Sequence, residues 1–193
     1  GSEMCIRDSI TRTYALGEVP NKMKEDFTIV AISNLQLANA KFLQGSTGLT
    51  LDILARKPFW DRGLNYNHGT GHGVGYLLNI HEGPAGFRYK FRAGETEEIQ
   101  EGMVITDEPG LYIEGSHGIR LENELLARKG VQNEYGQFLY FETITLIPFD
   151  LDAISLDMLN EENRKLLNDY HKRVYEEIAP HLNAVSYTHL TLP

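Results

Sequence analysis

The chain has 193 residues and a formal charge of −9, with 27 acidic side chains against 18 basic ones. This negative charge argues against nucleic acid or an anionic membrane surface as the main partner. The single cysteine, Cys5, excludes a disulfide within the chain. No apolar run approaches the roughly 20 residues that span a bilayer. We therefore expect one globular domain, located in the cytoplasm.

The two ends of the chain differ in pattern from the part between them. Residues 1–9 show neither helical nor strand periodicity, and residues 184–193 follow a helix without continuing its apolar face. We expect both ends to be non-native additions, so that the fold is formed by residues 10–183.

The first half of this range predicts one strand and two helices. β-Branched and aromatic residues favour a strand at 10–16, and a turn follows at 17–21. Helical spacing of apolar residues predicts a helix over 22–43, and a second helix runs from Thr50 to about Arg62. Glycine and histidine are frequent in 64–86, which we expect to form short strands and tight loops.

The second half predicts strands followed by a terminal helix. We expect strands at 103–106, 118–127 and 139–148. Apolar residues on one side of 155–181 predict an amphipathic helix.

Two histidines four residues apart lie in the most distinctive motif, His68-Gly69-Thr70-Gly71-His72-Gly73-Val74-Gly75. Glycine allows a ligand to approach the backbone closely, and a neutral imidazole is a common metal ligand. A third histidine, His81, follows in His81-Glu82-Gly83-Pro84. Exposed histidines in a glycine-rich turn would give the same short pattern, so the motif alone leaves both interpretations open.

Three charged residues in the second half are further candidates. Glu108 ends a predicted strand and precedes Pro109-Gly110, a pattern that by itself favours a solvent-facing acid. Arg120 and Glu122 are two apart in an apolar strand, so they share a face and need a partner or a metal ion if buried. A cross-strand ion pair on the surface is the alternative.

Together these motifs supply one histidine and two glutamates for a single site. Carboxylate-rich ligation suits hard or borderline divalent ions such as Mn²⁺, Zn²⁺ or Co²⁺. Bridging carboxylates suit two ions about 3.5–4 Å apart that activate one shared water. Spacing along the chain does not decide whether the three side chains converge.

Four segments of the chain resemble the Xaa-Pro aminopeptidase (aminopeptidase P) family of metallopeptidases. They are residues 68–84, 101–110, 118–123 and 141–149, in the same order as in the family. The resemblance implies the pita-bread fold, an α/β (α+β) architecture with a curved, mostly antiparallel sheet and helices on its outer face. Residues 10–183 would then form the C-terminal part of an N-terminally truncated catalytic domain.

The resemblance also implies a site for two metal ions, usually Mn²⁺, held by two Asp, one His and two Glu. His72 matches the histidine ligand, and Glu108 and Glu122 match the two glutamates. The family's second Asp opens the sequence Asp-Ile-Thr-Arg-Thr, whereas this chain has Ser9-Ile10-Thr11-Arg12-Thr13, with Ser9 at the ligand position. The neighbouring Asp8 would point to the opposite face of a strand.

The activity implied is release of the N-terminal residue from peptides with proline at the second position, by a hydroxide activated between two metal ions. In this scheme Glu108 acts as the general base, and His68 and His81 position the substrate and assist proton transfer. Arg120 supports a metal-bound carboxylate. We expect the intact protein to be a homodimer that acts on Xaa-Pro peptides.

Three alternatives compete with this interpretation. A prolidase would cleave Xaa-Pro dipeptides, although the spacing from His72 to His81 favours the aminopeptidase. A non-catalytic module with the same fold would bind peptides or proteins, although such modules lose the metal ligands that His72, Glu108 and Glu122 match. A truncated product with an exposed sheet edge would not fold stably.

Overall fold

The computed structural model describes residues 9–77, 79–93 and 97–183. The two predicted non-native segments therefore lie outside the described residues, apart from Ser9. Asp8 lies outside them as well. No helix in the described part of the chain is long and apolar enough to cross a membrane.

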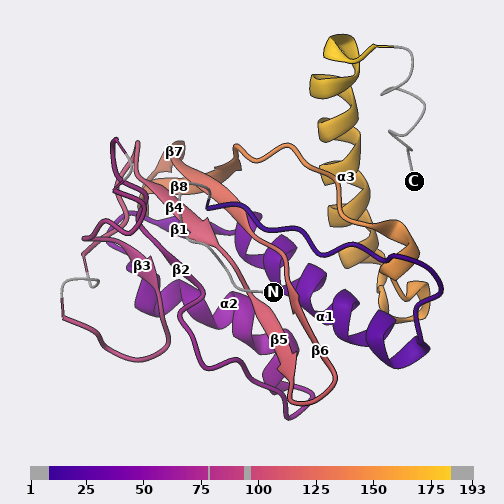
Figure 1. Cartoon of the computed structure of the whole chain (residues 1–193). Coiled ribbons are helices and arrows are strands. Elements are labelled where there is room, and N and C mark those ends of the chain that lie inside the picture. The colour runs from indigo at the N-terminus through magenta and orange to yellow at the C-terminus, as the bar shows by residue number, and fades with distance from the viewer. Residues whose placement is uncertain (1–8, 78, 94–96, 184–193) are drawn as a thin grey trace.

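An antiparallel sheet of four strands forms the centre of the molecule (Figure 1). Its strand order is β1-β8-β7-β4, so its two outer strands come from early and middle parts of the sequence. Each of its strand pairs is antiparallel, as expected. The strands are β1 (Lys41–Leu43), β8 (Gly136–Thr143), β7 (Asn123–Asn133) and β4 (Val104–Asp107).

Two short antiparallel pairs extend from this sheet. One joins β2 to β3 and the other joins β5 to β6. Gly73, directly after β2, forms a bridge to Ile105 of β4, which ties the first pair to the main sheet. The four strands are β2 (Gly71–His72), β3 (Gly86–Phe87), β5 (Gly110–Ile113) and β6 (His117–Arg120).

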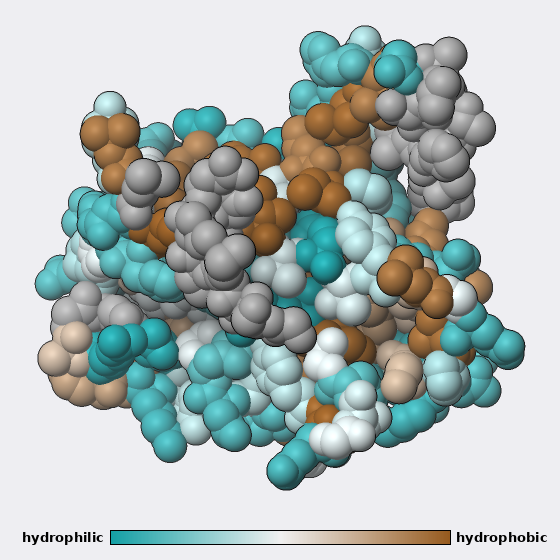
Figure 2. Space-filling model, in the orientation of Figure 1, coloured by the Kyte–Doolittle hydropathy of each residue, from teal (hydrophilic) through white to brown (hydrophobic). Residues whose placement is uncertain are grey.

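In the described part of the chain, three α-helices accompany the strands, as drawn in Figure 1. Helix α1 (Asn21–Ala38) and helix α2 (Gly48–Trp60) lie against the sheet, and α3 (Glu161–Ile178) stands at the far side of α1. On the face drawn in Figure 2, apolar side chains gather along the flank of α3. Short 3₁₀ turns flank α3 at Leu151–Ala153, Leu156–Met158 and Ala179–His181.

The buried apolar side chains form two clusters that share α1. One cluster joins the middle of α1 to α3 and to the β5–β6 pair, through residues such as Phe27, Leu35, Leu121 and Val174. The other joins the end of α1 and α2 to the main sheet, through residues such as Ala55, Ile105 and Leu125. Because α1 is buried against both, twelve of its 18 residues are buried, including Asp26, Ser33 and Asn34.

The predicted strand at 10–16 is wrong, because this segment makes only one bridge, between Thr11 and Glu122. Beyond this bridge, hydrogen bonds from side chains hold the segment in place. The Thr13 hydroxyl donates to the carbonyl of Arg120 at 3.0 Å. The Arg12 guanidinium donates to the carbonyl of Ile147 and to the hydroxyl of Tyr170, both at 2.8 Å. Arg12 thereby connects the first described residues to α3.

Several predicted boundaries also differ from the structure. The helix predicted over 22–43 ends at Ala38, and β1 follows it. The strand predicted over 118–127 is interrupted at Leu121 and Glu122, where the chain passes from the β5–β6 pair to the main sheet. The strand predicted at 139–148 spans 136–143 instead, and the terminal helix starts at Glu161 because the Asn160 side chain caps it.

Candidate metal centre

His72, Glu108 and Glu122 meet at one place, which we name the metal centre. One ligand atom from each lies within 4.8 Å of the others. The three come from separate elements: His72 ends β2, Glu108 follows β4, and Glu122 lies between β6 and β7. The structure thus brings together three candidate ligands that the sequence places in three different motifs. Two carboxylates this close repel each other unless a cation or a proton lies between them.

The backbone around His72 fixes which ring nitrogen faces the other two residues. Its Nδ1 lies 3.0 Å from the carbonyl oxygen of Gly73. A carbonyl only accepts, so Nδ1 carries the proton and Nε2 carries the lone pair. Nε2 lies 3.6 Å from Oε1 of Glu108. This is the tautomer that metal-ligating histidines adopt when the second nitrogen binds a carbonyl.

Close backbone contact between β2 and β4 requires glycine at position 71. A Cβ atom on Gly71 would lie 1.7 Å from the carbonyl oxygen of Thr106. The same contact allows the amide of His72 to donate to the Thr106 hydroxyl at 2.9 Å. The glycine therefore sets the distance between the strand that carries His72 and the strand that ends at Glu108.

Glu108 is held by three neighbours. Its amide donates to the carbonyl of Thr70 at 2.7 Å, and its Oε1 accepts from the Thr106 hydroxyl at 3.1 Å. Its Oε2 lies 3.9 Å from Nη1 of Arg120. Arg120 in turn donates from Nε to the hydroxyl of Tyr112 at 2.9 Å. Arg120 therefore lies next to the carboxylate of Glu108, and its supporting role stays a prediction.

Glu122 is the most buried member of the metal centre, with 5% of its surface exposed. The Thr11 hydroxyl donates to its Oε2 at 2.5 Å. Ser9, two residues before Thr11, is 4% exposed. Its hydroxyl has no hydrogen-bond partner among the residues that the structure describes.

The other two candidate histidines flank the metal centre. The ring of His81 lies 4.1 Å from the ring of His72, measured between centroids. His68 lies beside Tyr112, the residue that binds Arg120, with ring centroids 5.5 Å apart. Its Nδ1 lies 2.7 Å from the carbonyl of Gly69, so Nδ1 carries the proton and Nε2 the lone pair. Their functional roles remain predictions.

Sequence reasoning missed a buried carboxylate next to the metal centre. Asp107 ends β4 and is fully buried, and neither of its oxygens has a hydrogen-bond partner within the described ranges. Burial raises the pKa of Asp107 well above its usual value, and the charges of Glu108, Asp52 and Glu122 add to this effect. The available signal was an acid at the end of the strand Val104-Ile105-Thr106-Asp107, directly before Glu108.

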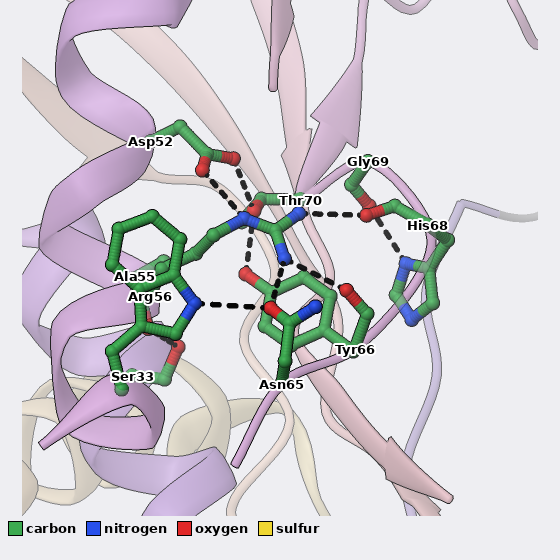
Figure 3. Close-up of polar contacts among 10 residues, drawn as sticks. Ser33, Asp52, Ala55, Arg56, Asn65, Tyr66, His68, Gly69 and Thr70 are labelled. Atoms are coloured by element: carbon green, nitrogen blue, oxygen red, sulfur yellow. Dashed lines mark hydrogen bonds and ion pairs between the residues drawn. The ribbon is translucent and has the colours of Figure 1, made fainter. Parts of the chain in front are cut away.

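A second missed feature is a buried network of polar side chains that contacts the glycine-histidine loop, residues 68–75 (Figure 3). We name this network the Arg56 clamp. Asp52 and Arg56 of α2 are both completely buried and form an ion pair at 2.7 Å. Burial raises the pKa of the Asp52 carboxyl, and hydrogen bonds from Thr70 and Arg56 act in the opposite direction. An acid and an arginine four residues apart, between Leu51, Ala55 and Phe59, were the signal in the sequence.

Comparison with known proteins places this chain in a family. Residues 6–129 match metallopeptidase family M24, and residues 137–191 match the C-terminal region of peptidase M24. The chain is 43% identical to aminopeptidase P1 of Arabidopsis thaliana over 178 residues, which cover 90% of this chain and 27% of that protein. The chain therefore spans about a quarter of the length of this relative.

Solved structures agree with this match. The X-prolyl aminopeptidase of Caenorhabditis elegans, described as a cytosolic enzyme with a di-nuclear active site, aligns with a TM-score of 0.83 at 37% identity. The alignment covers 94% of this chain and 29% of that one. The Xaa-Pro dipeptidase of Bacillus anthracis aligns with a TM-score of 0.57 at 36% identity, over 74% of this chain and 36% of that one. The chain therefore belongs to metallopeptidase family M24 and has its pita-bread fold.

Proposed function

We propose that this chain forms the C-terminal part of the catalytic domain of an Xaa-Pro aminopeptidase, which removes the N-terminal residue from peptides with proline at position two. The observation that carries the proposal is the convergence of His72, Glu108 and Glu122 within 4.8 Å. The similarity to aminopeptidase P1 and to the nematode X-prolyl aminopeptidase supports this substrate class.

The donor set of the metal centre fits a divalent cation. It combines one imidazole nitrogen with two carboxylates, which is the ligation that Mn²⁺, Zn²⁺ or Co²⁺ accept. The two carboxylates supply charge for more than one ion, and the nematode enzyme is described as di-nuclear. We therefore propose two divalent ions, with Mn²⁺ as the preferred metal.

Ions bound there would polarise the scissile carbonyl and lower the pKa of a water molecule. The protein's own groups then handle the proton and the substrate. Glu108 accepts the proton of the attacking water, and the Thr106 hydroxyl, 3.1 Å from its Oε1, fixes the orientation of the carboxylate. Arg120, 3.9 Å from Oε2, would hold the second oxygen of this carboxylate in place.

His68 and His81 serve the substrate in this scheme. His81 lies beside His72 and is exposed, so its ring is accessible to a peptide at the metal centre. Nε2 of His68 would accept a hydrogen bond from a peptide N–H through its lone pair, and once protonated its N–H would donate one. Both histidines lie on loops rather than in the main sheet.

The decisive assay uses the full-length protein with Mn²⁺ and follows the released amino acid by mass spectrometry. We expect release from an Xaa-Pro-Xaa tripeptide, no release from the matched Xaa-Ala-Xaa tripeptide, and loss of release with a chelator. Preference for the Xaa-Pro dipeptide over the tripeptide would favour a prolidase, which the similarity to the Bacillus dipeptidase makes the second candidate. Metal binding without release from any of these peptides would favour a binding module.

Two further expectations accompany the activity. The nematode relative is described as cytosolic, which supports a cytoplasmic location for this protein. We also propose that the intact protein is a homodimer. Sedimentation of the full-length protein that gives the mass of one chain at micromolar concentration would contradict that part.

A further inference from the structure

We propose that Arg56 is the positioning residue for His68, so that a side chain buried behind the glycine-histidine loop sets the geometry of the substrate site in front of it. The inference rests on the proposed function, because His68 receives its role there. It goes further by assigning a function to an ion pair that none of the motifs of the site includes.

The first step is the reach of the guanidinium, drawn in Figure 3. Nη2 donates to the carbonyl of His68 at 2.7 Å, and Nη1 donates to the carbonyl of Tyr66 at 2.8 Å and to Oδ1 of Asn65 at 3.0 Å. One side chain of α2 therefore binds the segment at three residues, Asn65, Tyr66 and His68. A planar fork is needed, because a single ammonium cannot address acceptors spread over this arc.

The second step is the rigidity of the guanidinium itself. Its Nε donates to Oδ2 of Asp52 at 2.7 Å, and both side chains are completely buried. Its central carbon lies 4.0 Å from the ring centroid of Tyr66 and 4.4 Å from that of Tyr89. The two aromatic rings and the acid hold the guanidinium in one orientation. The guanidinium therefore fixes the positions of the carbonyl groups that it binds.

The third step concerns the acid of the pair. Oδ1 of Asp52 accepts from the Thr70 hydroxyl at 2.5 Å, and that hydroxyl accepts from the Tyr66 hydroxyl at 2.5 Å. Asp52 and Arg56 thus grip the loop on both sides of His68, one through a side chain and one through a carbonyl. The ring of His68 is locked locally by its own Nδ1–H bond to Gly69. Its position in space then depends on where the clamp holds the backbone.

The alternative is that the ion pair only stabilises the fold. A stability role predicts that loss of the clamp lowers activity in proportion to the unfolded fraction and independently of His68. A positioning role predicts that loss of the clamp and loss of His68 damage the same step. A double-mutant cycle separates the two, because residues acting through one another give non-additive effects.

The variants are Arg56→Lys, His68→Ala and the double variant, in the full-length protein with Mn²⁺. Arg56→Lys keeps the charge opposite Asp52 and removes the fork, so the protein is expected to fold. The matched control is Arg128→Lys, because Arg128 also donates from Nε to a carboxylate at 2.7 Å, but on the surface. Turnover of an Xaa-Pro-Xaa peptide gives kcat and KM for each.

We expect Arg56→Lys to lower kcat/KM about 100-fold, since a displacement of about 1 Å at a positioning group has effects of this size. The double variant should lose no more than His68→Ala alone, and Arg128→Lys should match the wild type. Losses that multiply in the double variant, or wild-type kcat/KM in Arg56→Lys, would overturn the inference.

A second measurement does not depend on activity. Deuterium uptake of the peptide covering residues 65–71, followed by mass spectrometry, should rise in Arg56→Lys and stay unchanged in Arg128→Lys. Unchanged uptake in Arg56→Lys overturns the clamp even if the wild type has no peptidase activity. Raised uptake with no wild-type release from Xaa-Pro peptides keeps the clamp and refutes the proposed function instead.

Discussion

The metal centre and the Arg56 clamp both involve the glycine-histidine segment, but their charged groups make contacts of different length. In the clamp, the guanidinium of Arg56 has four acceptors between 2.7 and 3.0 Å and no exposed surface. In the metal centre, the contacts from His72 and Arg120 to Glu108 are 3.6 and 3.9 Å long. The clamp is a network of direct hydrogen bonds, whereas the metal centre brings three ligand atoms within 4.8 Å of one another, a spacing at which they can share a cation.

The largest effect should come from the metal centre. Glu108→Gln keeps the shape of the side chain and removes its capacity to take a proton. We expect turnover of an Xaa-Pro-Xaa peptide to fall by about 10²–10⁴-fold, the usual contribution of a general base. The matched control is Glu142→Gln, at a carboxylate that pairs with Arg128 and Arg173. Normal turnover in Glu108→Gln would show that the base assignment is wrong.

Breaking the Arg56 clamp should lower the free energy of unfolding. Asp52→Ala leaves the guanidinium of Arg56 buried without its partner, and removal of one member of a buried pair costs about 3–5 kcal/mol. Urea denaturation followed by circular dichroism measures the change. Glu142→Ala breaks a surface pair of the same 2.7 Å length, and its denaturation midpoint should not move measurably. Equal shifts in both variants would remove the distinction between the two pairs.

A buried group outside both regions gives a reference for pH. Burial, with a smaller contribution from Arg12, lowers the pKa of His171 from 6.5 to about 4, and its Nε2 accepts from the amide of Phe149 at 3.2 Å. As the pH falls, His171 is therefore protonated near pH 6.5 in the unfolded chain but only near pH 4 in the folded chain. Stability from this group is complete above pH 6.5 and is lost as the pH falls to about 4, by up to about 3 kcal/mol.

His171→Gln tests this, because glutamine retains an acceptor and does not titrate. The difference in free energy of unfolding between wild type and variant should shrink as the pH falls through this window. A difference that stays constant from pH 7 to pH 4 would contradict the assignment. Measuring the difference cancels the contribution of the carboxylates, which titrate in both proteins.

The smallest effect should come from completing the metal centre. Ser9→Asp adds a carboxylate where the family resemblance places a ligand, and metal affinity rises with the number of charged ligands. We expect Mn²⁺ to bind at least about tenfold more tightly by calorimetry, since even supporting groups of a metal site are worth about 10–100-fold. Ser116→Asp, on an exposed turn, is the control. Equal affinity in wild type and Ser9→Asp would place residue 9 outside the site.

The residue pattern named His72, Glu108 and Glu122 as candidates but did not decide whether they meet, and only the family resemblance implied that they share one site. Their proximity is a finding of the structure, whereas the boundaries of several elements were predicted wrongly. The end of α1 was missed because Phe42 is buried in β1 at a position that also fits helical spacing. The interruption at Leu121 was missed because both halves of the segment are strands, and only tertiary structure shows that they belong to different sheets.

The distances and the supporting contacts could not be predicted. The tautomer of His72 depends on the local path of the chain at Gly73, which residue type does not reveal. The clamp depends on α2 lying behind the loop, so Arg56 and His68 meet only after the sheet and the helix have packed. A single sequence shows that an arginine in an apolar helix needs a partner. It does not show which carbonyls that arginine will find.

Arg12 has a consequence for how the protein is made. Its bond to Tyr170 joins residues 158 positions apart, and the same guanidinium binds the carbonyl of Ile147. During synthesis this junction therefore forms only after Tyr170 has left the ribosome, 158 residues after Arg12. Until then the segment that carries Ser9 and Thr11 is not held by the hydrogen bonds of Arg12. Contacts between residues so far apart in sequence form slowly during folding. The edge that presents Thr11 to Glu122 is consequently among the last parts of the site to mature during synthesis.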